Sequence, residues 1–336
     1  MTESAAIYGC AGPALTDAER RFFRAADPFG FIVFLRNIET PAQIARLVAD
    51  LRETVGRNAP VLIDQEGGRV ARLKPPQWRA APPAARFGQL ASRDRNAAAE
   101  AVRLNARLLA VELSALGIDV DCAPVLDLRL PGAHEVIGDR AFGADPEIVA
   151  FLGRAMMDGF MTAGVMPVVK HIPGHGRASV DSHLSLPRVA TARAELEETD
   201  FRAFRLCAEA PWAMTAHVVY SAIDGERPAT TSPIMIGQVI RGSIGFDGLL
   251  LSDDLSMQAL AGSLAERAGD SLAAGCDIVL HCNGKMDEME AVAGAVGPLS
   301  PEARRRAAAA RARLGAAVEP GEMAALAARL DTLLVA

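Results

Sequence analysis

The sequence predicts an α/β protein of the (β/α)8 TIM-type barrel class, because eight short apolar runs alternate with longer amphipathic segments. Each run is nearly continuous in apolar residues, which is typical of parallel strands that helices cover on both faces. Eight such units within residues 5–285 suit a closed barrel better than an open doubly wound sheet. The absence of a Gly-x-Gly-x-x-Gly after the first run disfavours a dinucleotide-binding fold. The predicted strands are residues 6–11, 29–35, 61–64, 118–125, 166–171, 212–220, 249–252 and 277–282.

The segments between these strands carry helix signals. Thr16 and Glu19 have the spacing of a capping box, so a short helix is expected over 16–24. Thr40 can cap the next helix and Pro41 suits its first turn, and the apolar residues that follow recur every three or four positions. Further helices are expected over 97–116, 146–163, 192–208, 233–244 and 263–274, and the second helix over 40–55.

The last fifty residues differ in composition from the barrel. They are rich in Ala and Arg, and Pro298, Pro301 and Pro320 punctuate them. We interpret residues 286–336 as helices that close the barrel, so the whole chain, 1–336, is expected to form a single domain.

Composition excludes several classes of function. The 336 residues include 35 Lys and Arg against 41 Asp and Glu, and a net charge of −6 argues against nucleic-acid binding. No apolar run approaches the ~20 residues that span a bilayer, so no membrane association is expected. The N-terminus lacks the basic region of a secretory signal. The five cysteines form no C-x-x-C pair and are expected to be buried free thiols, which indicates a cytoplasmic protein.

Ionisable residues directly follow five of the eight predicted strands. In a barrel of this class, active sites lie at the C-terminal ends of the strands. Five coincidences at that end favour a functional site over isolated strand-end caps. The residues concerned are Asp64 and Glu66, Asp127, Lys170 and His171, His217, and Asp253 with Asp254.

The segment that follows the fifth strand is the most informative. Residues 171–183 contain three of the six histidines of the chain. Pro173-Gly174 and Gly176 interrupt regular structure, which predicts a long loop. Asp181 and His183 are two residues apart, so the carboxylate can accept a proton from one imidazole nitrogen while the other nitrogen faces a substrate.

Five motifs in fixed order resemble glycoside hydrolase family 3, and within it the bacterial β-N-acetylglucosaminidases. They are DQEGGRV at 64–70, KHIPGHG at 170–176, DSH at 181–183, AHVVY at 216–220 and SDDLSM at 252–257. Together they span more than half of the chain, and several motifs in order are more specific than any one of them.

The resemblance implies roles for three catalytic residues. Asp253 is the expected nucleophile, because a carboxylate can attack an anomeric carbon and later leave from a glycosyl ester. Asp254 is its neighbour, but adjacent residues on a strand end point apart. His183, polarised by Asp181, is the expected general acid and base, since imidazole titrates near neutral pH.

Other positions carry over from the family to substrate binding. An Asp and a Lys suit charge-assisted hydrogen bonds to vicinal sugar hydroxyls, and Glu66 is expected to support the site from beneath. No cofactor and no metal are expected. The implied binding residues are Asp64, Arg72, Arg140, Lys170 and His171, with His217 expected to line the same pocket.

The resemblance implies a retaining exo-β-N-acetylglucosaminidase, a β-N-acetylhexosaminidase, that acts on cell-wall fragments. Its partner would be a small saccharide or muropeptide in which N-acetylglucosamine is linked to an anhydro-N-acetylmuramyl peptide. Peptidoglycan recycling in the cytoplasm, by a monomer, is the expected setting.

Three alternatives remain open from the residues alone. A phosphorylase of the same family is possible, because a histidine acid/base places no second carboxylate where phosphate would approach. A metal-dependent barrel hydrolase could draw ligands from the histidines and Asp253, although the first strand lacks the usual His-x-His. A non-enzymatic sugar-binding barrel would leave Asp253 and His183 idle.

Overall fold

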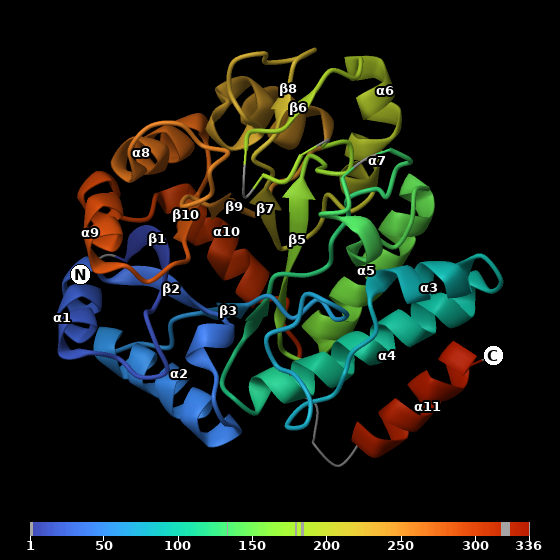
Figure 1. Ribbon diagram of the computed structural model, residues 1–336, viewed down its shortest axis with the longest axis horizontal. Helices are drawn as coiled ribbons and strands as arrows, with labels where there is room; N and C mark the ends of the chain where they lie inside the picture. The colour runs from blue at the N-terminus through green and yellow to red at the C-terminus, as the bar shows by residue number, and fades with distance from the viewer. Residues whose placement is uncertain (1–2, 133, 179, 183–184, 317–322, 336) are drawn as a thin grey trace.

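A closed barrel of eight parallel strands forms the centre of the molecule, as predicted (Figure 1). The computed structural model describes residues 3–335 except 133, 179, 183–184 and 317–322. Around the barrel the strand order is β1-β10-β9-β7-β5-β4-β3-β2. The barrel strands are β1 (Ser4–Gly9), β2 (Pro28–Val33), β3 (Val61–Ile63), β4 (Val120–Asp121), β5 (Met166–Ile172), β7 (Trp212–Thr215), β9 (Leu249–Asp254) and β10 (Ile278–His281).

Helices surround the strands, and two of the predicted caps are present. The Thr16 hydroxyl accepts from the Glu19 N–H in a capping box, and the Thr40 hydroxyl accepts from the Gln43 N–H. The surrounding helices are α1 (Asp17–Ala26), α2 (Pro41–Val55), α3 (Ala84–Ala91), α4 (Arg95–Ser114), α5 (Pro146–Thr162), α6 (Arg193–Glu198), α7 (Asp200–Arg205), the π-helix η4 (Met235–Ser243), α8 (Leu264–Ala274) and α9 (Met286–Ala295).

Three predicted elements differ from the structure. The strand expected over 118–125 is reduced to β4, because Pro124 has no N–H to donate to a ladder. The strand expected over 212–220 leaves the barrel after β7, and its end forms β8 (Val219–Tyr220). β8 pairs with β6 (Arg188–Val189) in a small separate sheet.

The helix expected over 192–208 breaks into α6 and α7 at Thr199, whose φ of −120° and ψ of −91° are not helical. Helix α3 was not predicted. Its eight residues are too few to show a clear apolar period, and its position depends on packing against α4.

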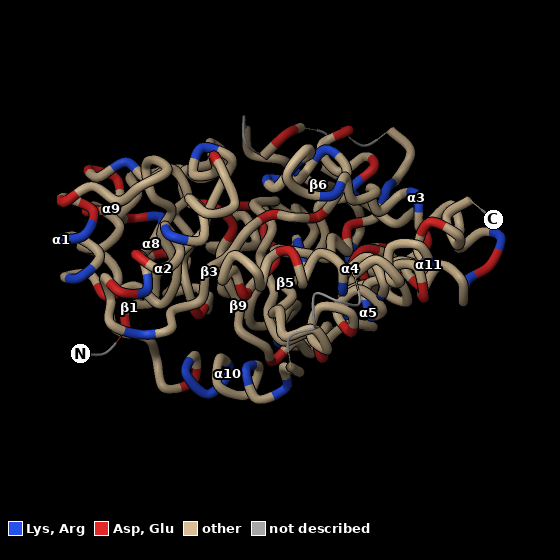
Figure 2. Tube along the Cα trace, turned by 90° about the horizontal axis from the view of Figure 1, so that it is seen from below, with Lys and Arg blue, Asp and Glu red and all other residues tan. Residues whose placement is uncertain are grey.

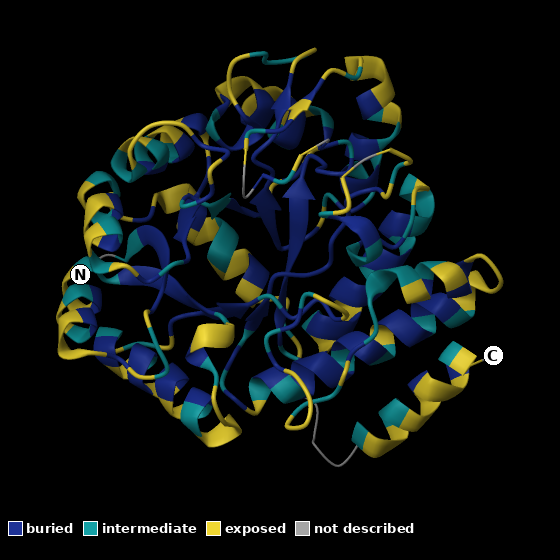
Figure 3. Cartoon of the chain, in the orientation of Figure 1, coloured by how far each residue is buried: buried dark blue, intermediate teal, exposed yellow. Residues whose placement is uncertain are grey.

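Two apolar layers build the core, one inside the barrel and one between strands and helices. Figure 3 shows the barrel strands buried and the outer faces of the surrounding helices exposed. The strands contribute to both layers because alternate side chains point to opposite faces. Inside the barrel, the ring centroids of Phe29 and Trp212 lie 5.7 Å apart. All five cysteines are buried and free, which confirms the predicted thiols. Among the described residues, none of the helices combines the length and apolarity that crossing a bilayer requires.

Helix α10 (Pro301–Arg311) lies across the N-terminal end of the barrel, where Figure 2 shows it beneath the strands. Its Ala303 and Ala310 are buried with the residues of the barrel interior. Helix α11 (Met323–Val335) instead packs on the outside against α4, where Arg329 pairs with Glu100 at 2.7 Å. The two C-terminal helices therefore cover different faces.

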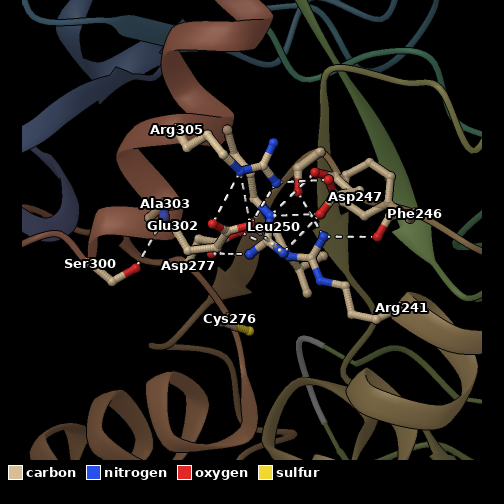
Figure 4. Close-up of polar contacts among 12 residues, drawn as sticks. Arg241, Phe246, Asp247, Leu250, Cys276, Asp277, Ser300, Glu302, Ala303 and Arg305 are labelled. Carbon is tan, nitrogen blue, oxygen red and sulfur yellow. Dashed lines mark hydrogen bonds and ion pairs between the residues drawn. The ribbon is translucent and has the colours of Figure 1, made fainter.

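Charged side chains attach α10 to the barrel (Figure 4). Asp277, just before β10, accepts from Arg241 and from Arg306 at 2.9 Å each. Arg305 and Arg306 also pair with Asp247, at 2.8 and 3.0 Å. Apolar packing and ion pairs at the barrel edge thus hold α10 against the N-terminal end of the barrel.

Candidate active site

A cavity of about 420 Å³ opens at the C-terminal end of the barrel. It is the end at which the sequence predicts the functional site. Seven of the predicted site residues line this cavity: Asp64, Arg72, Arg140, Lys170, His171, Asp181 and Asp253. Residues from five separate parts of the sequence therefore meet in one place.

A buried group of charges forms one wall of the cavity. The Lys170 ammonium on β5 lies 2.8 Å from Asp64 Oδ1 and 2.7 Å from Glu66 Oε1. Arg72 donates to Asp64 Oδ2 at 2.9 Å, and Arg140 donates through Nε and a terminal nitrogen to the two oxygens of Glu66, each at 2.8 Å. Two carboxylates thus alternate with three cations.

These pairs keep the whole group ionised. Burial by itself would raise the pKa of the Asp64 carboxyl, but the cations of Lys170 and Arg72 outweigh it and hold that pKa well below its usual range. Glu66 behaves in the same way, because Arg140 and Lys170 overcome its burial and lower its pKa to about 2. Burial would lower the pKa of Lys170, but the two carboxylates raise it. A fixed ionised array of this kind suits hydrogen bonding to sugar hydroxyls.

A tight turn after β3 places Asp64 and Arg72 side by side. The Gln65 side chain accepts from the Arg72 and Leu73 N–H groups and donates to the Leu73 carbonyl. Gly67 has a φ of +100°, and a Cβ there would lie 2.4 Å from the Pro82 carbonyl oxygen. Only glycine fits this position, which explains the Gly-Gly pair of the first motif.

A third buried carboxylate, that of Asp127, orients His171. Asp127 is fully buried, and its Oδ2 lies 2.6 Å from His171 Nδ1. Its Oδ1 accepts the His175 N–H at 2.6 Å. Burial would raise the pKa of Asp127, but the charge of His171 and its hydrogen bond lower it. With Nδ1 donating to Asp127, the Nε2 of His171 is left for a ligand.

Two adjacent carboxylates at the end of β9 have different surroundings. Asp254 accepts from the Ser256 N–H and hydroxyl at 3.1 and 2.5 Å and from the Cys282 N–H at 3.1 Å. Its carboxylate therefore holds the turn that follows the strand. Asp253 accepts the Asp254 N–H at 2.8 Å and lines the cavity. Both carboxylates border the cavity, but that of Asp254 is engaged by three donors of the following turn and of β10's end.

The loop after β5 brings Asp181 to the cavity. Ser182 is buried, and its hydroxyl lies 3.0 Å from His175 Nε2. Burial, with a contribution from the charge of His171, lowers the pKa of His175 to about 4, so this ring is neutral at pH 7. His183, the expected acid and base, lies outside the described residues.

His217 occupies a different place from the one expected. It is fully buried, with Nδ1 2.7 Å from the Thr230 hydroxyl and Nε2 3.0 Å from the Asp254 carbonyl oxygen. Both ring nitrogens are therefore engaged behind the end of β9, and His217 is not among the described residues that line the cavity. Its position supports the strand end that carries the two carboxylates.

Sequence reasoning underestimated two residues. The sequence predicts Asp127 only as an ionisable residue at a strand end, and Glu66 only as a residue that supports the site from beneath. The structure shows that Asp127 orients His171 and that Glu66 contacts both Lys170 and Arg140. Their signal in the sequence is the same strand-end position, but nothing local shows which cation each one meets.

A model of the glycosyl hydrolase family 3 N-terminal domain matches residues 18–314. The chain belongs to this family. Curated relatives with the name beta-hexosaminidase indicate which type of family 3 enzyme the chain resembles. The one from Alkalilimnicola ehrlichii is 43% identical over 286 residues, which cover 82% of this chain and 80% of the relative. The one from Thiobacillus denitrificans is 42% identical over 291 residues, which cover 84% and 79%.

Solved structures of family 3 enzymes share the fold. Native NagZ from Neisseria gonorrhoeae is 33% identical and superposes with a TM-score of 0.87 over 100% of this chain and 98% of that one. A second structure of that protein is a complex with N-trifluoroacetyl-D-glucosamine, at the same identity, TM-score and coverage. A third carries a zinc ion, at 31% identity and a TM-score of 0.86, with the same coverage. This family 3 member is accordingly a glycoside hydrolase of the β-N-acetylhexosaminidase type.

Within the described part of the chain, no group of three or more His, Cys, Asp or Glu side chains is arranged to hold a metal ion. The described histidines nearest the cavity are engaged with Asp127, Ser182 and Thr230 through ring nitrogens.

Proposed function

We propose that the protein is a retaining exo-β-N-acetylglucosaminidase that removes a terminal N-acetylglucosamine by double displacement. The observation that carries this proposal is the placement of Asp253 in the same cavity as the array of Asp64, Lys170 and His171. The array offers charged donors and acceptors for the hydroxyls of one sugar, and the carboxylate is available to its anomeric carbon.

In the first step, an Asp253 oxygen forms a bond to the anomeric carbon as the glycosidic C–O bond breaks. The leaving oxygen receives a proton from His183, which Asp181 orients. In the second step, water transfers one of its own protons to the imidazole as its oxygen attacks the anomeric carbon, and Asp253 leaves as the carboxylate. Two inversions at one carbon retain the β configuration. No cofactor takes part in either step.

The proposed substrate is N-acetylglucosamine linked to an anhydro-N-acetylmuramyl peptide, and the proposed role is peptidoglycan recycling in the cytoplasm. The glucosamine-derived ligand of the gonococcal structure supports the sugar part of this proposal. The motif resemblance supports the muramyl part.

A mechanism-based 5-fluoro-N-acetylglucosaminyl fluoride tests the nucleophile. We expect one equivalent of inactivator to become attached to the peptide that contains Asp253, as measured by mass spectrometry after digestion. Attachment to Asp254, or to no residue during time-dependent inactivation, would contradict the proposal.

A panel of nitrophenyl glycosides, assayed with phosphate and with a chelator, separates hydrolysis from phosphorolysis and from metal-dependent catalysis. The 4-nitrophenyl glycosides of N-acetylglucosamine, N-acetylgalactosamine and glucose are turned over with and without inorganic phosphate. We expect free N-acetylglucosamine, first released as the β anomer by NMR, in both conditions. Formation of a sugar 1-phosphate would indicate a phosphorylase, and loss of activity on chelation would indicate a metal enzyme.

A further inference from the structure

One arginine at the rim of the cavity binds a neighbouring loop at four points. Arg69 follows the double glycine of the turn after β3, and 47% of its side chain is exposed. Its Nε donates to Asp139 Oδ1 at 2.8 Å. A terminal nitrogen of the same guanidinium, with two N–H bonds, lies 2.7, 2.8 and 3.1 Å from the carbonyl oxygens of Glu135, Val136 and Ile137, so these three acceptors share its two hydrogens.

The bound segment, residues 134–140, lies between two parts of the site. At its end, Arg140 holds Glu66 and also donates to the Val136 carbonyl at 3.1 Å. At its start, the His134 N–H donates to the Ala178 carbonyl at 3.0 Å. Ala178 belongs to the loop after β5, three residues before Asp181, and its own N–H donates to the His175 carbonyl at 3.1 Å.

The contacts of Arg69 therefore form a connected path across three loops. Arg69 leaves from the loop after β3, residues 134–140 follow β4, and Ala178 lies on the loop after β5. Asp181, on that third loop, lines the cavity. Hydrogen bonds between described residues connect Arg69 to residues 135–137 and His134 to Ala178, and Asp181 follows Ala178 by three positions in the chain.

We propose that Arg69 is a positioning residue for proton transfer, because it fixes the 134–140 segment against which the Asp181 loop is docked. The inference rests on the proposed function, in which Asp181 orients the acid and base. The planar guanidinium suits the task, since it donates in fixed directions to several acceptors, whereas an ammonium is a compact charge. Arg69 itself touches neither the nucleophile nor any reacting atom in this role.

The test compares two substrates that differ in how much their leaving group needs protonation. A 4-nitrophenyl N-acetylglucosaminide has an acidic leaving group, and N,N′-diacetylchitobiose has a sugar hydroxyl. For Arg69→Ala we expect kcat/KM to fall about 100-fold on chitobiose and about 10-fold or less on the nitrophenyl substrate, as misplacement of an acid by about 1 Å predicts.

Arg129→Ala is the matched control. Arg129 is 51% exposed and approaches Glu135 of the same segment at 3.6 Å, but only through a weak ion pair. Its substitution removes a positive charge that faces the same segment and leaves the four contacts of Arg69 in place. We expect kcat/KM of this variant to remain within about twofold of the wild type on both substrates. Equal losses for the two variants would overturn the proposal.

Two further variants keep the proposal testable if Arg69→Ala is unstable. Arg69→Lys retains the charge but cannot reproduce the fork, so it should lower activity on chitobiose in the same direction. Wild-type values for this variant would overturn the proposal. In an Asp181→Asn background, Arg69→Ala should no longer change the ratio of kcat/KM between the two substrates, and a persistent change would contradict the path through Asp181.

The outcomes distinguish the inference from the proposed function. If the wild-type protein cleaves neither substrate, the proposed function is wrong. If the wild type cleaves both and Arg69→Ala loses activity equally on both, the function stands and only the positioning role of Arg69 is wrong.

Discussion

The two ends of the barrel are both rich in ion pairs, but those pairs have different surroundings. At the mouth, the side chains of Lys170 and Glu66 are 3% and 6% exposed and border an open cavity. At the base, Asp277 is buried, but Arg305 and Asp247 are about half exposed or more. The pairs at the base attach a helix, whereas those at the mouth hold charges ready for a ligand.

The larger of the two cavities is not the one that the predicted site residues line. The larger cavity, about 640 Å³, lies at the base between α10 and the starts of the strands. Its floor is apolar, with Phe29, Met166 and Trp212. The mouth cavity is smaller but contains the charged array and Asp253. The mouth cavity differs from the base cavity in its buried array of paired charges and in Asp253, not in a larger volume.

The largest expected effect separates the two carboxylates of β9. Asp253→Asn removes the attacking oxygen and should lower kcat about 10⁴-fold or more, with little change in melting temperature. Steady-state assays on the nitrophenyl substrate measure the loss.

Asp254→Asn is the paired variant. The Asp254 carboxylate accepts from Ser256 and Cys282, and an amide accepts these hydrogen bonds less well. The variant should therefore lower the free energy of unfolding by about 1–3 kcal/mol. A stable Asp254→Asn protein that is as inactive as Asp253→Asn would reverse the assignment.

Lys170→Met tests the buried array at the mouth. It leaves Asp64 and Glu66 without the cation that they share, and breaking a buried pair costs about 3–5 kcal/mol in the free energy of unfolding. Urea denaturation at pH 7 measures this change. The control is Lys285→Met, because Lys285 is 65% exposed in its pair with Glu288 and should contribute no more than about 1 kcal/mol. Similar values for both variants would show that burial does not decide the cost.

His175 gives the mouth a pH dependence. Because its pKa is lowered from 6.5 to about 4 in the folded protein, the unfolded chain binds more protons between these values. Stability should therefore be complete above about pH 6.5 and should fall by up to about 3 kcal/mol as the pH approaches 4. His175→Asn should make this part of the stability curve flatter. Burial also lowers the pKa of His217, so a smaller slope should remain. Denaturation at pH 7 and pH 4.5 compares the two proteins, and an unchanged slope would contradict the assignment.

Substitutions at the base should change stability but not activity. Asp277→Asn weakens hydrogen bonds from Arg241 and Arg306 and should lower the free energy of unfolding by about 1.5–3 kcal/mol, because charged donors are involved. Asp247→Asn, at a side chain that is 66% exposed, should cost no more than about 1 kcal/mol. Neither should change kcat/KM, and a specific loss of activity in a stable Asp277→Asn protein would mean that the two ends of the barrel are coupled.

Much of the fold could be predicted because its signals are local. Continuous apolar runs indicate parallel strands, and the caps at Thr16 and Thr40 mark helix starts. The predicted bounds of an element are wrong where contacts with distant segments override the local sequence pattern. The run over 212–220 is mostly apolar, but after Thr215 the chain leaves the barrel and pairs instead with β6. Nothing in that run shows which strand its end will meet.

The order of residues alone determined that charged groups gather at one end of a barrel, because every parallel strand presents its C-terminal end on the same side. Only the tertiary structure decided which of these groups meet. Lys170 contacts Asp64 across 106 positions, His171 selects Asp127, and His217 lies behind β9 instead of in the cavity. These contacts depend on the register of the strands and on the distances between side chains of distant segments. Neither can be predicted from a short stretch of sequence.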